Sequence, residues 1–321
     1  MALHGLIDLI QTTDEFSYLV GGLRRGHREQ LVVGASGSYK PALMAGLHTV
    51  VNELQRPLLV ITYSPLQAER LWQELSSLAP DTEVLLYPAN EVYPHEEVNR
   101  NLDLARERIQ VMTAAVLKRL AISIAPIQAV VERIVPPQAC AQGILHIDMD
   151  TRIDTEQIAQ HLVDAGYERV EMVEGVGQFS IRGGIIDVFP LVAQRPVRIE
   201  LFDDEVDSLR EFDLESQRSL EKISEVFISP AIELLVTSQD RQAIVPQLQS
   251  MLERQVRKLE SSNLLEAADA LEKRIGEHIE KLSNGMYFPG IEQYRPLLVP
   301  DSTLIIDYFT DALVVIDEPA R

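Results

Sequence analysis

The segment from Val33 to Pro41 (VGASGSYKP) has the outline of a phosphate-binding loop. Such a loop reads Gly-x-x-x-x-Gly-Lys-Ser/Thr between a strand and a helix, because its backbone N–H groups and its lysine hold the phosphates and its hydroxyl binds Mg²⁺. Gly34 and Lys40 stand at the first glycine and at the lysine, and Gly37 lies between them. The spacing therefore indicates a nucleotide site, and the remaining positions decide whether it works.

Two residues of this loop remove contacts that ATP hydrolysis requires. Tyr39 replaces the second glycine, and its ring occupies space where the backbone must approach the phosphates closely. Pro41 replaces the hydroxyl residue, and proline offers neither an oxygen for the metal nor a backbone N–H for the phosphate. We therefore expect no hydrolysis at this loop, whereas weak binding of an anion by Lys40 stays open.

An acidic pair near the other end of the sequence completes the outline of an ATPase site. Asp317 and Glu318 follow the apolar run 313–316. In an ATPase, such an aspartate holds the Mg²⁺ shell and such a glutamate prepares the attacking water. Because Pro41 cannot ligate the metal, we interpret the pair as a relic at the end of a strand. The 7 histidines are scattered without the spacing of a zinc site, so no metal is expected.

Strands and helices alternate along the first segment of the chain, which favours a parallel sheet covered by helices. The apolar runs predict strands at 30–33, 58–62, 84–87 and 121–125. An apolar period of three to four predicts helices at 42–54, 65–78 and 101–120. In the second of these helices, four side chains are expected to point inward, namely Leu66, Leu71, Trp72 and Leu75. The damaged loop would follow the first strand, where such a sheet binds its nucleotide.

Residues 136–229 differ from the first segment in pattern. They begin with a double proline and contain short strand-like runs, one predicted helix at 154–165 and predicted turns at 183–184 and 203–205. Acidic residues outnumber basic ones here by more than two to one. We expect a small, acidic α+β module inserted into a larger fold.

The remainder of the chain, 230–321, is mostly helical by its apolar spacing, and two closing strands are predicted at 303–307 and 313–316. We therefore predict an α/β protein with three domains. These are a parallel-sheet domain at 1–135, the inserted α+β domain at 136–229, and a helix-rich domain at 230–321 that returns to the first sheet.

Composition restricts the class of function. One cysteine, Cys140, excludes a disulfide framework and a zinc site built on several thiolates, and it fits a reducing cytoplasm. No run of about 18 apolar residues is present, so no membrane span is expected. The net charge of -20 opposes a general nucleic-acid surface, because phosphate binding needs clustered Lys and Arg. The expected partners are proteins, the expected location is the cytoplasm, and DNA binding is expected to be weak.

Two stretches, 177–190 (GQFSIRGGIIDVFP) and 198–210 (RIELFDDEVDSLR), resemble a module shared by the excision-repair helicase UvrB and the N-terminal part of the transcription-repair coupling factors, the Mfd family. The resemblance extends from the loop at Gly34 to Asp317-Glu318-Pro319 and is strongest in 166–213. It implies a UvrB-like architecture: a RecA-like domain with a degenerate loop, an inserted UvrA-binding α+β domain, and a helix-rich third domain.

Two departures separate this chain from UvrB itself. A UvrB carries an intact loop ending in Gly-Lys-Thr and a long tyrosine-rich hairpin that probes damaged DNA. This chain has Tyr39-Lys40-Pro41 in the loop, and only the short stretch 87–97 in place of the hairpin. Both losses resemble the coupling factors, which implies a non-catalytic module that recruits UvrA to lesion-stalled RNA polymerase for nucleotide excision repair. The alternative is a UvrB-type, ATP-dependent helicase domain for damage verification.

The resemblance also implies which residues contact UvrA. The matching positions are Arg169 and Arg182, whereas a third arginine of UvrB aligns with Ser180 here. The planar guanidinium group suits such contacts because it pairs with a carboxylate through two hydrogen bonds. Alternatively, each arginine pairs with a local carboxylate of this acidic module. Phe179 and Phe189 are candidate apolar contacts, or else core residues.

For an intact coupling factor, the resemblance implies further partners outside this region. A motor in later domains would use ATP and Mg²⁺ to move on double-stranded DNA and displace RNA polymerase, and a C-terminal domain would mask the UvrA-binding face. The sequence stops at Arg321, just after the acidic pair, so we expect it to be the N-terminal part of such a protein. For this part itself we expect no catalytic residue, no cofactor and no metal.

Overall fold

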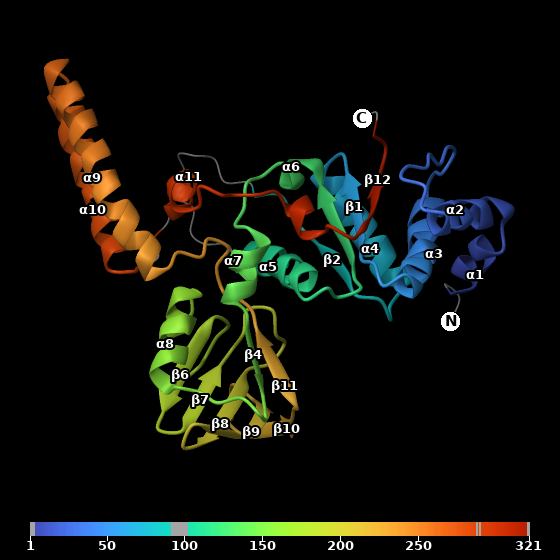
Figure 1. Cartoon of the computed structure of the whole chain (residues 1–321), viewed down its shortest axis with the longest axis horizontal. Coiled ribbons are helices and arrows are strands. Elements are labelled where there is room, and N and C mark those ends of the chain that lie inside the picture. Colours follow the sequence, from blue (N-terminus) through green and yellow to red (C-terminus); the bar gives the residue numbers. More distant parts are fainter. Residues whose placement is uncertain (1–3, 91–101, 287, 289, 320–321) are drawn as a thin grey trace. The chain divides into compact units, whose positions relative to one another are not determined.

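The computed structural model describes residues 4–90, 102–286, 288 and 290–319. The predicted short stretch at 87–97 falls largely outside these residues. The chain divides into two compact units, and each is described by itself (Figure 1). Unit 1 contains residues 1–90, 110–133 and 303–321, and unit 2 contains residues 91–109 and 134–302. The division into three domains stays a prediction.

Unit 1 is built on a four-stranded parallel sheet in the order β12-β1-β3-β2. The strands are β1 (Leu58–Thr62), β2 (Val84–Leu86), β3 (Ile122–Pro126) and β12 (Leu313–Ile316). β1 and β3 are buried along their whole length, as continuous apolar runs predict for strands covered on both faces. β12 comes from the far end of the sequence and pairs with β1, with Leu313 opposite Leu58.

Helices surround this sheet. The helices of unit 1 are α1 (His4–Gln11), α2 (Asp14–Arg24), α3 (Tyr39–Glu53), α4 (Pro65–Leu78), α6 (Ile127–Val130) and the C-terminal part of α5 (Leu102–Val116). α4 begins where the sequence predicts, because the Ser64 hydroxyl accepts a backbone N–H and Pro65 suits the first helical position. Leu71 and Leu75 of α4 are buried in the core of the sheet, whereas Leu66 is 78% exposed and its predicted inward position is wrong.

The strand predicted at 30–33 does not form. These residues pair with no strand in the described part of the chain, and Leu31 and Val33 are 82% and 83% exposed. An apolar run becomes a strand only when a neighbouring strand pairs with its backbone, so its composition alone is insufficient.

The strand predicted at 303–307 is also wrong, because this segment contains a 3₁₀ helix, Ile305–Tyr308. The Asp307 carboxylate accepts the backbone N–H of Leu304 at 3.0 Å, and this cap turns the chain. The other strands and helices predicted for unit 1 are found with boundaries shifted by at most a few residues.

Unit 2 contains a six-stranded sheet in the order β10-β9-β8-β7-β6-β5. Its strands are β5 (Glu168–Arg169), β6 (Gln178–Arg182), β7 (Ile185–Val188), β8 (Val197–Phe202), β9 (Glu205–Phe212) and β10 (Ser219–Lys222). Neighbours pair antiparallel except β5, which is parallel to β6. β4 (Leu145–Asp148) and β11 (Glu225–Ile228) form a separate antiparallel pair. The mixed α/β class predicted from the sequence is therefore confirmed.

The two turns predicted in this module connect neighbouring strands. Gly183-Gly184 joins β6 to β7, with Gly183 in the left-handed region at φ 61°. A side chain on Gly184 would meet the carbonyl oxygen of Leu201 at 2.9 Å. Asp203, at the turn between β8 and β9, also has a φ of 61°. The glycine pair therefore has a structural role, because it permits both the turn and the close approach of β8.

One face of the six-stranded sheet is apolar and packs against α8 (Thr155–Asp164). The Asp154 carboxylate accepts the backbone N–H groups of the first helical turn, so α8 begins where the sequence predicts. The core between helix and sheet includes Leu162 of α8 and Phe179, Ile186 and Ile199 of three adjacent strands. Because side chains alternate along a strand, the residues between these point to the opposite, polar face.

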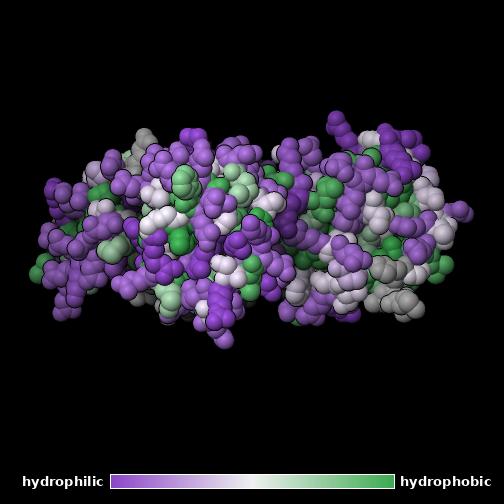
Figure 2. Space-filling model, turned by 90° about the horizontal axis from the view of Figure 1, so that it is seen from below, coloured by the Kyte–Doolittle hydropathy of each residue, from purple (hydrophilic) through white to green (hydrophobic). Residues whose placement is uncertain are grey.

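The remaining helices of unit 2 are α7 (Pro137–Gly143), α9 (Ser238–Ser261), α10 (Leu265–Ser283), α11 (Arg295–Leu298) and a 3₁₀ helix (Ile291–Tyr294). α9 and α10 run side by side as a hairpin (Figure 1). On the face shown in Figure 2, hydrophilic residues predominate and hydrophobic ones form small, scattered groups. Within the described part of the chain, every helix is too short or too polar to cross a membrane.

Candidate functional site

The phosphate-loop segment leads into α3, as its spacing predicts, but without a preceding strand. Gly34 and Gly37 have φ values of 88° and 55°, which glycine adopts without strain. α3 begins at Tyr39, so Pro41 lies in its first turn, where a missing N–H removes no helical hydrogen bond. Pro41 is buried, and Tyr39 is 37% exposed. Pro41 is therefore well suited to the first turn of the helix.

The loop lysine is bound by the relic acidic pair. Lys40 Nζ donates to Asp317 Oδ1 and to Glu318 Oε1, each at 2.7 Å. Gln67 Nε2 donates to the second oxygen of Asp317 at 3.1 Å. The side chains of Lys40 and Asp317 are only 16% and 3% exposed. Burial by itself lowers the pKa of Lys40, but hydrogen bonds and charges from both carboxylates outweigh burial and raise it above its ordinary value of 10.5.

This arrangement opposes nucleotide binding. A phosphate approaching Lys40 would have to displace two carboxylates, one of them almost fully buried. A divalent cation approaching Asp317 and Glu318 would compete with the ammonium group that already pairs with both carboxylates. Among the described residues, no three His, Cys, Asp or Glu side chains lie together as metal ligands do. The geometry thus holds the acidic pair to the start of α3 instead of presenting it to a ligand.

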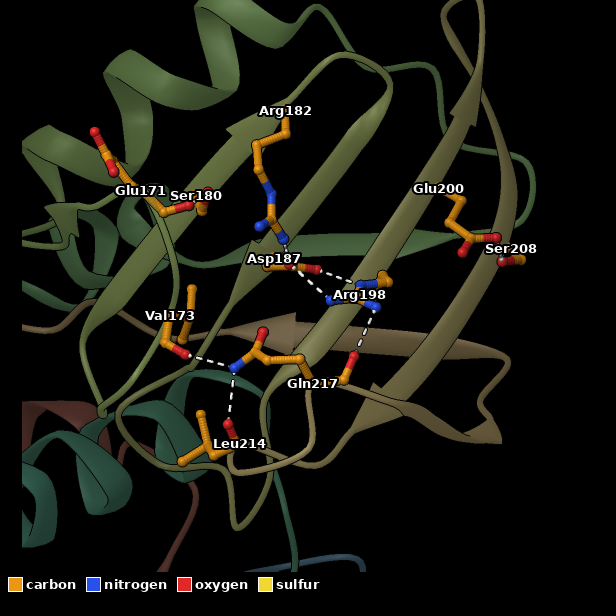
Figure 3. Close-up of polar contacts among 10 residues, drawn as sticks. All are labelled: Glu171, Val173, Ser180, Arg182, Asp187, Arg198, Glu200, Ser208, Leu214 and Gln217. Atoms are coloured by element: carbon orange, nitrogen blue, oxygen red, sulfur yellow. Dashed lines mark hydrogen bonds and ion pairs between the residues drawn. The ribbon is translucent and has the colours of Figure 1, made fainter.

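On the polar face of the unit 2 sheet, two arginines converge on one buried carboxylate (Figure 3). Arg182 Nη2 donates to Asp187 Oδ2 at 2.6 Å. Arg198 donates through Nε to Oδ1 at 2.7 Å and through Nη2 to Oδ2 at 2.9 Å. The Asp187 side chain is 1% exposed and that of Arg198 14%, whereas that of Arg182 is 48% exposed. The cluster carries one surplus positive charge, and Arg182 brings it to the surface.

Arg198 is fixed by contacts on its other side. Its Nη1 donates to the carbonyl oxygen of Gln217 at 3.2 Å, and its guanidinium group lies over the Phe212 ring, 4.8 Å from the centroid. Gln217 is itself held, because its Nε2 donates to the carbonyl oxygens of Val173 and Leu214 at 3.1 and 2.8 Å (Figure 3). The hydrogen bonds with Asp187 raise the pKa of Arg198.

Sequence reasoning identified Arg182 but missed Asp187 and Arg198. One signal was present: an aspartate interrupts the otherwise apolar strand Ile185–Val188. A buried carboxylate in a strand needs a cationic partner. The partner becomes identifiable only from the register of β7 and β8, which places Arg198 directly opposite Asp187.

Arg169 lies at the edge of the same sheet. It belongs to the edge strand β5, its side chain is exposed, and no ion pair with another described residue is found. It stands in register with Phe179, whose ring points into the core below α8. Arg182 is three residues further along β6, so alternation directs it to the opposite face. The two arginines therefore share one edge of the sheet, not one face.

The two phenylalanines and Ser180 are directed inward. Phe179 is fully buried, and Phe189 is 7% exposed in a cluster with Val173 and Phe212. The structure places both rings in the interior, so we do not include them in a contact surface. Ser180 is 1% exposed, and its hydroxyl donates to the carbonyl oxygen of Glu171 at 2.8 Å. It offers no substitute for the third arginine of UvrB.

Comparisons with known proteins agree with the resemblance in this module. Residues 145–234 match the family described as the UvrB interaction domain. The chain is 34% identical over 313 residues to the transcription-repair-coupling factor of Bacillus subtilis (strain 168), covering 97% of this chain and 26% of that protein. It is 31% identical over 296 residues to the corresponding protein of Staphylococcus aureus (strain MRSA252), covering 91% and 24%.

A third relative, the transcription-repair-coupling factor of Staphylococcus haemolyticus (strain JCSC1435), is 31% identical over 299 residues, covering 92% of this chain and 25% of that protein. The chain thus spans about a quarter of the length of the relatives it matches. In each case the match extends over more than nine tenths of this chain. The chain is therefore similar, over nearly its whole length, to a part of the transcription-repair-coupling factors, and residues 145–234 match the UvrB interaction domain.

Proposed function

We propose that this chain is a non-catalytic module that binds UvrA and so recruits it to lesion-stalled RNA polymerase for nucleotide excision repair. The observation that carries the proposal is the half-exposed Arg182, held on a buried carboxylate inside the UvrB interaction domain. Arginine held in this way can meet an acidic group of UvrA with a charge-assisted hydrogen bond. The exposed Arg169 at the neighbouring edge strand supplies a second such donor.

Direct binding of purified UvrA to the immobilised chain tests this proposal. At about 0.15 M salt, where surface charges separated by more than about 8 Å are screened, we expect saturable binding in the micromolar range or tighter. The module 136–229 alone should compete with the full chain for UvrA if it folds independently. Absence of binding at concentrations of about 50 µM, well above the expected range, would contradict the proposal.

We further propose that unit 1 is a RecA-like domain whose nucleotide site is closed by its own carboxylates. The support comes from the parallel sheet, the loop before α3, and the ion pairs from Lys40 to Asp317 and Glu318. Without a metal-binding hydroxyl, and with its lysine already neutralised, this site lacks the groups that stabilise phosphoryl transfer. On this view ATP and Mg²⁺ serve only motor domains elsewhere in a full-length coupling factor.

The chain should accordingly release no phosphate from ATP above background, with or without DNA. Tyr39→Gly combined with Pro41→Thr should not restore hydrolysis, because the paired carboxylates still hold Lys40. A steady-state phosphate-release assay measures both proteins. Turnover stimulated by DNA would favour the alternative function, a UvrB-type helicase domain for damage verification.

The wider role places the protein in the cytoplasm, where a full-length coupling factor would also contact RNA polymerase and double-stranded DNA through other domains. Masking of the UvrA-binding face by a C-terminal domain belongs to the same proposal. The acidic character of this chain supports the assignment of DNA binding to other domains, since a net charge of -20 repels DNA phosphates.

A further inference from the structure

We propose that Asp187 and Arg198 are positioning residues that hold Arg182 as a preorganised binding point for a carboxylate of the partner. This inference rests on the proposed binding of UvrA and adds two residues and a mechanism to it. Neither residue need touch the partner. Both would act through the orientation of the Arg182 guanidinium group.

The hydrogen bonds around Asp187 are more numerous than its burial requires. Arg198 alone satisfies the carboxylate with a bidentate pair, at 2.7 Å to one oxygen and 2.9 Å to the other. The additional bond from Arg182, at 2.6 Å, joins a half-exposed side chain to this buried centre. Because Arg198 already supplies a cationic partner to both oxygens of Asp187, loss of the third bond would leave no buried charge without a partner. The main effect of the third hydrogen bond is therefore to fix the orientation of the Arg182 guanidinium group.

The anchor itself has little freedom to move. Arg198 is locked between Asp187, the carbonyl oxygen of Gln217 and the ring of Phe212. Asp187 lies in a central strand, paired on both sides by β6 and β8. Figure 3 shows the guanidinium groups of Arg182 and Arg198 directed toward Asp187, and they come from the two strands that flank β7. A rigid centre of this kind fixes the end of the Arg182 side chain relative to the sheet.

The Arg182 fork is only partly used. Within the described residues, Nη2 is its one nitrogen in a hydrogen bond, so Nε and Nη1 are open to an incoming acceptor. The charge balance favours an anion, because the buried carboxylate is shared by two permanently charged guanidinium groups. A carboxylate on the partner would complete a two-arginine, two-carboxylate arrangement.

Holding the side chain before binding improves affinity, since less rotamer freedom is lost when the complex forms. A lysine at this position would keep the charge but not the planar fork, which can donate to two carboxylates in fixed directions. If orientation matters, a lysine at position 182 should weaken binding, whereas if charge alone matters, it should not. Experiment can therefore separate the two effects.

A double-mutant cycle in UvrA binding provides the test, with Arg182→Ala, Asp187→Asn and the double variant in the full chain. We expect Arg182→Ala to weaken binding about 30-fold or more, and Asp187→Asn about 10-fold, from the loss of orientation. The double variant should bind no more weakly than Arg182→Ala alone, because Asp187 acts through Arg182. An equal loss from Asp187→Asn in both backgrounds would overturn the proposal.

Arg195→Ala is a matched control, because Arg195 is 54% exposed and pairs with one carboxylate, Glu211, in the same module. It removes the same charge without touching Asp187, and binding should change less than about threefold. If Asp187→Asn fails to fold, Arg182→Lys replaces it. We expect Arg182→Lys to bind about 10-fold more weakly, and full-strength binding would show that charge without orientation suffices.

Failure of the proposed function is recognised separately, because the unmodified chain would then not bind UvrA at all. In that case, ¹⁵N relaxation of the arginine side chains still decides the positioning claim. In the unmodified chain, Arg182 Nε should be more rigid than Arg195 Nε. In the Asp187→Asn variant, Arg182 Nε should become mobile. If that variant does not fold, Asp187→Glu takes its place. An Arg182 as mobile as Arg195 would overturn the proposal.

Discussion

Replacing both Arg169 and Arg182 by alanine should abolish UvrA binding or weaken it by well over 30-fold. Truncating one charged, partly desolvated interface residue typically costs about 2–5 kcal/mol, partly because its partner is left without a counter-charge. At about 1.4 kcal/mol per decade, even the lower figure corresponds to roughly 30-fold for each arginine. The measurement is a titration of UvrA on the immobilised chain at about 0.15 M salt.

The same double variant should unfold at nearly the temperature of the parent chain. Arg169 has no ion pair with a described residue, and Asp187 keeps both hydrogen bonds from Arg198 when Arg182 is removed. Full-strength UvrA binding by the double variant would remove both residues from the interface. A large fall in melting temperature would instead show that the arginines are structural, which is the alternative considered from the sequence.

The position of the two arginines adds a geometric expectation. Because they point to opposite sides of one sheet edge, a partner that contacts both must clasp the edge formed by β5 and the end of β6. A partner lying flat on the polar face would depend on Arg182 alone. The single variants distinguish these cases: comparable losses indicate the edge, and a loss confined to Arg182→Ala indicates the face.

Removing the loop lysine should destabilise unit 1 more than any surface ion pair does. Among the side chains that the structure describes, Lys40→Ala leaves the buried carboxylate of Asp317 with only the 3.1 Å hydrogen bond from Gln67. Breaking a fully buried pair in this way costs about 3–5 kcal/mol, and we expect about 2–3 kcal/mol here because Glu318 is a third exposed. The stabilisation is complete below the ordinary pKa of 10.5, and it is lost as the pH rises through the raised pKa of Lys40.

Urea unfolding followed by tryptophan fluorescence measures the loss of unfolding free energy in unit 1. Trp72 is the sole tryptophan of the chain, and it lies in α4, where its Nε1 donates to the carbonyl oxygen of Val84 at 3.0 Å. Arg70→Ala is a suitable control, because Arg70 pairs with Glu74 on the surface of the same helix and should contribute about 0.3–0.5 kcal/mol.

Replacing both Lys40 and Asp317 by neutral residues isolates the interaction energy between them. Lys40→Met combined with Asp317→Asn leaves no buried charge without a partner, so the double variant should be more stable than Lys40→Met alone. Strictly additive losses would contradict a direct interaction between the two groups. A fall in stability no larger than that of Arg70→Ala would show that the lysine is effectively solvated.

By itself, the sequence determined which groups of a working phosphate-binding loop are missing here. Pro41 has no hydroxyl and no backbone N–H in any fold, so the loss of the metal ligand follows from residue identity alone. The start of α4 and the buried strand β1 were also predictable, because a cap, an N-terminal proline and a continuous apolar run act over a few neighbouring residues.

Only the tertiary structure decided what the remaining groups do. Lys40 meets Asp317 across 277 residues, and Arg198 meets Asp187 across adjacent strands, so neither pair could be read from spacing. Residues 30–33 have the composition of a strand without a neighbour to pair with, and strand formation depends on that neighbour. The register of the strands decides which face of the sheet carries Phe179, Arg169 or Arg182. A shift of the register by one residue would move every side chain of a strand to the other face.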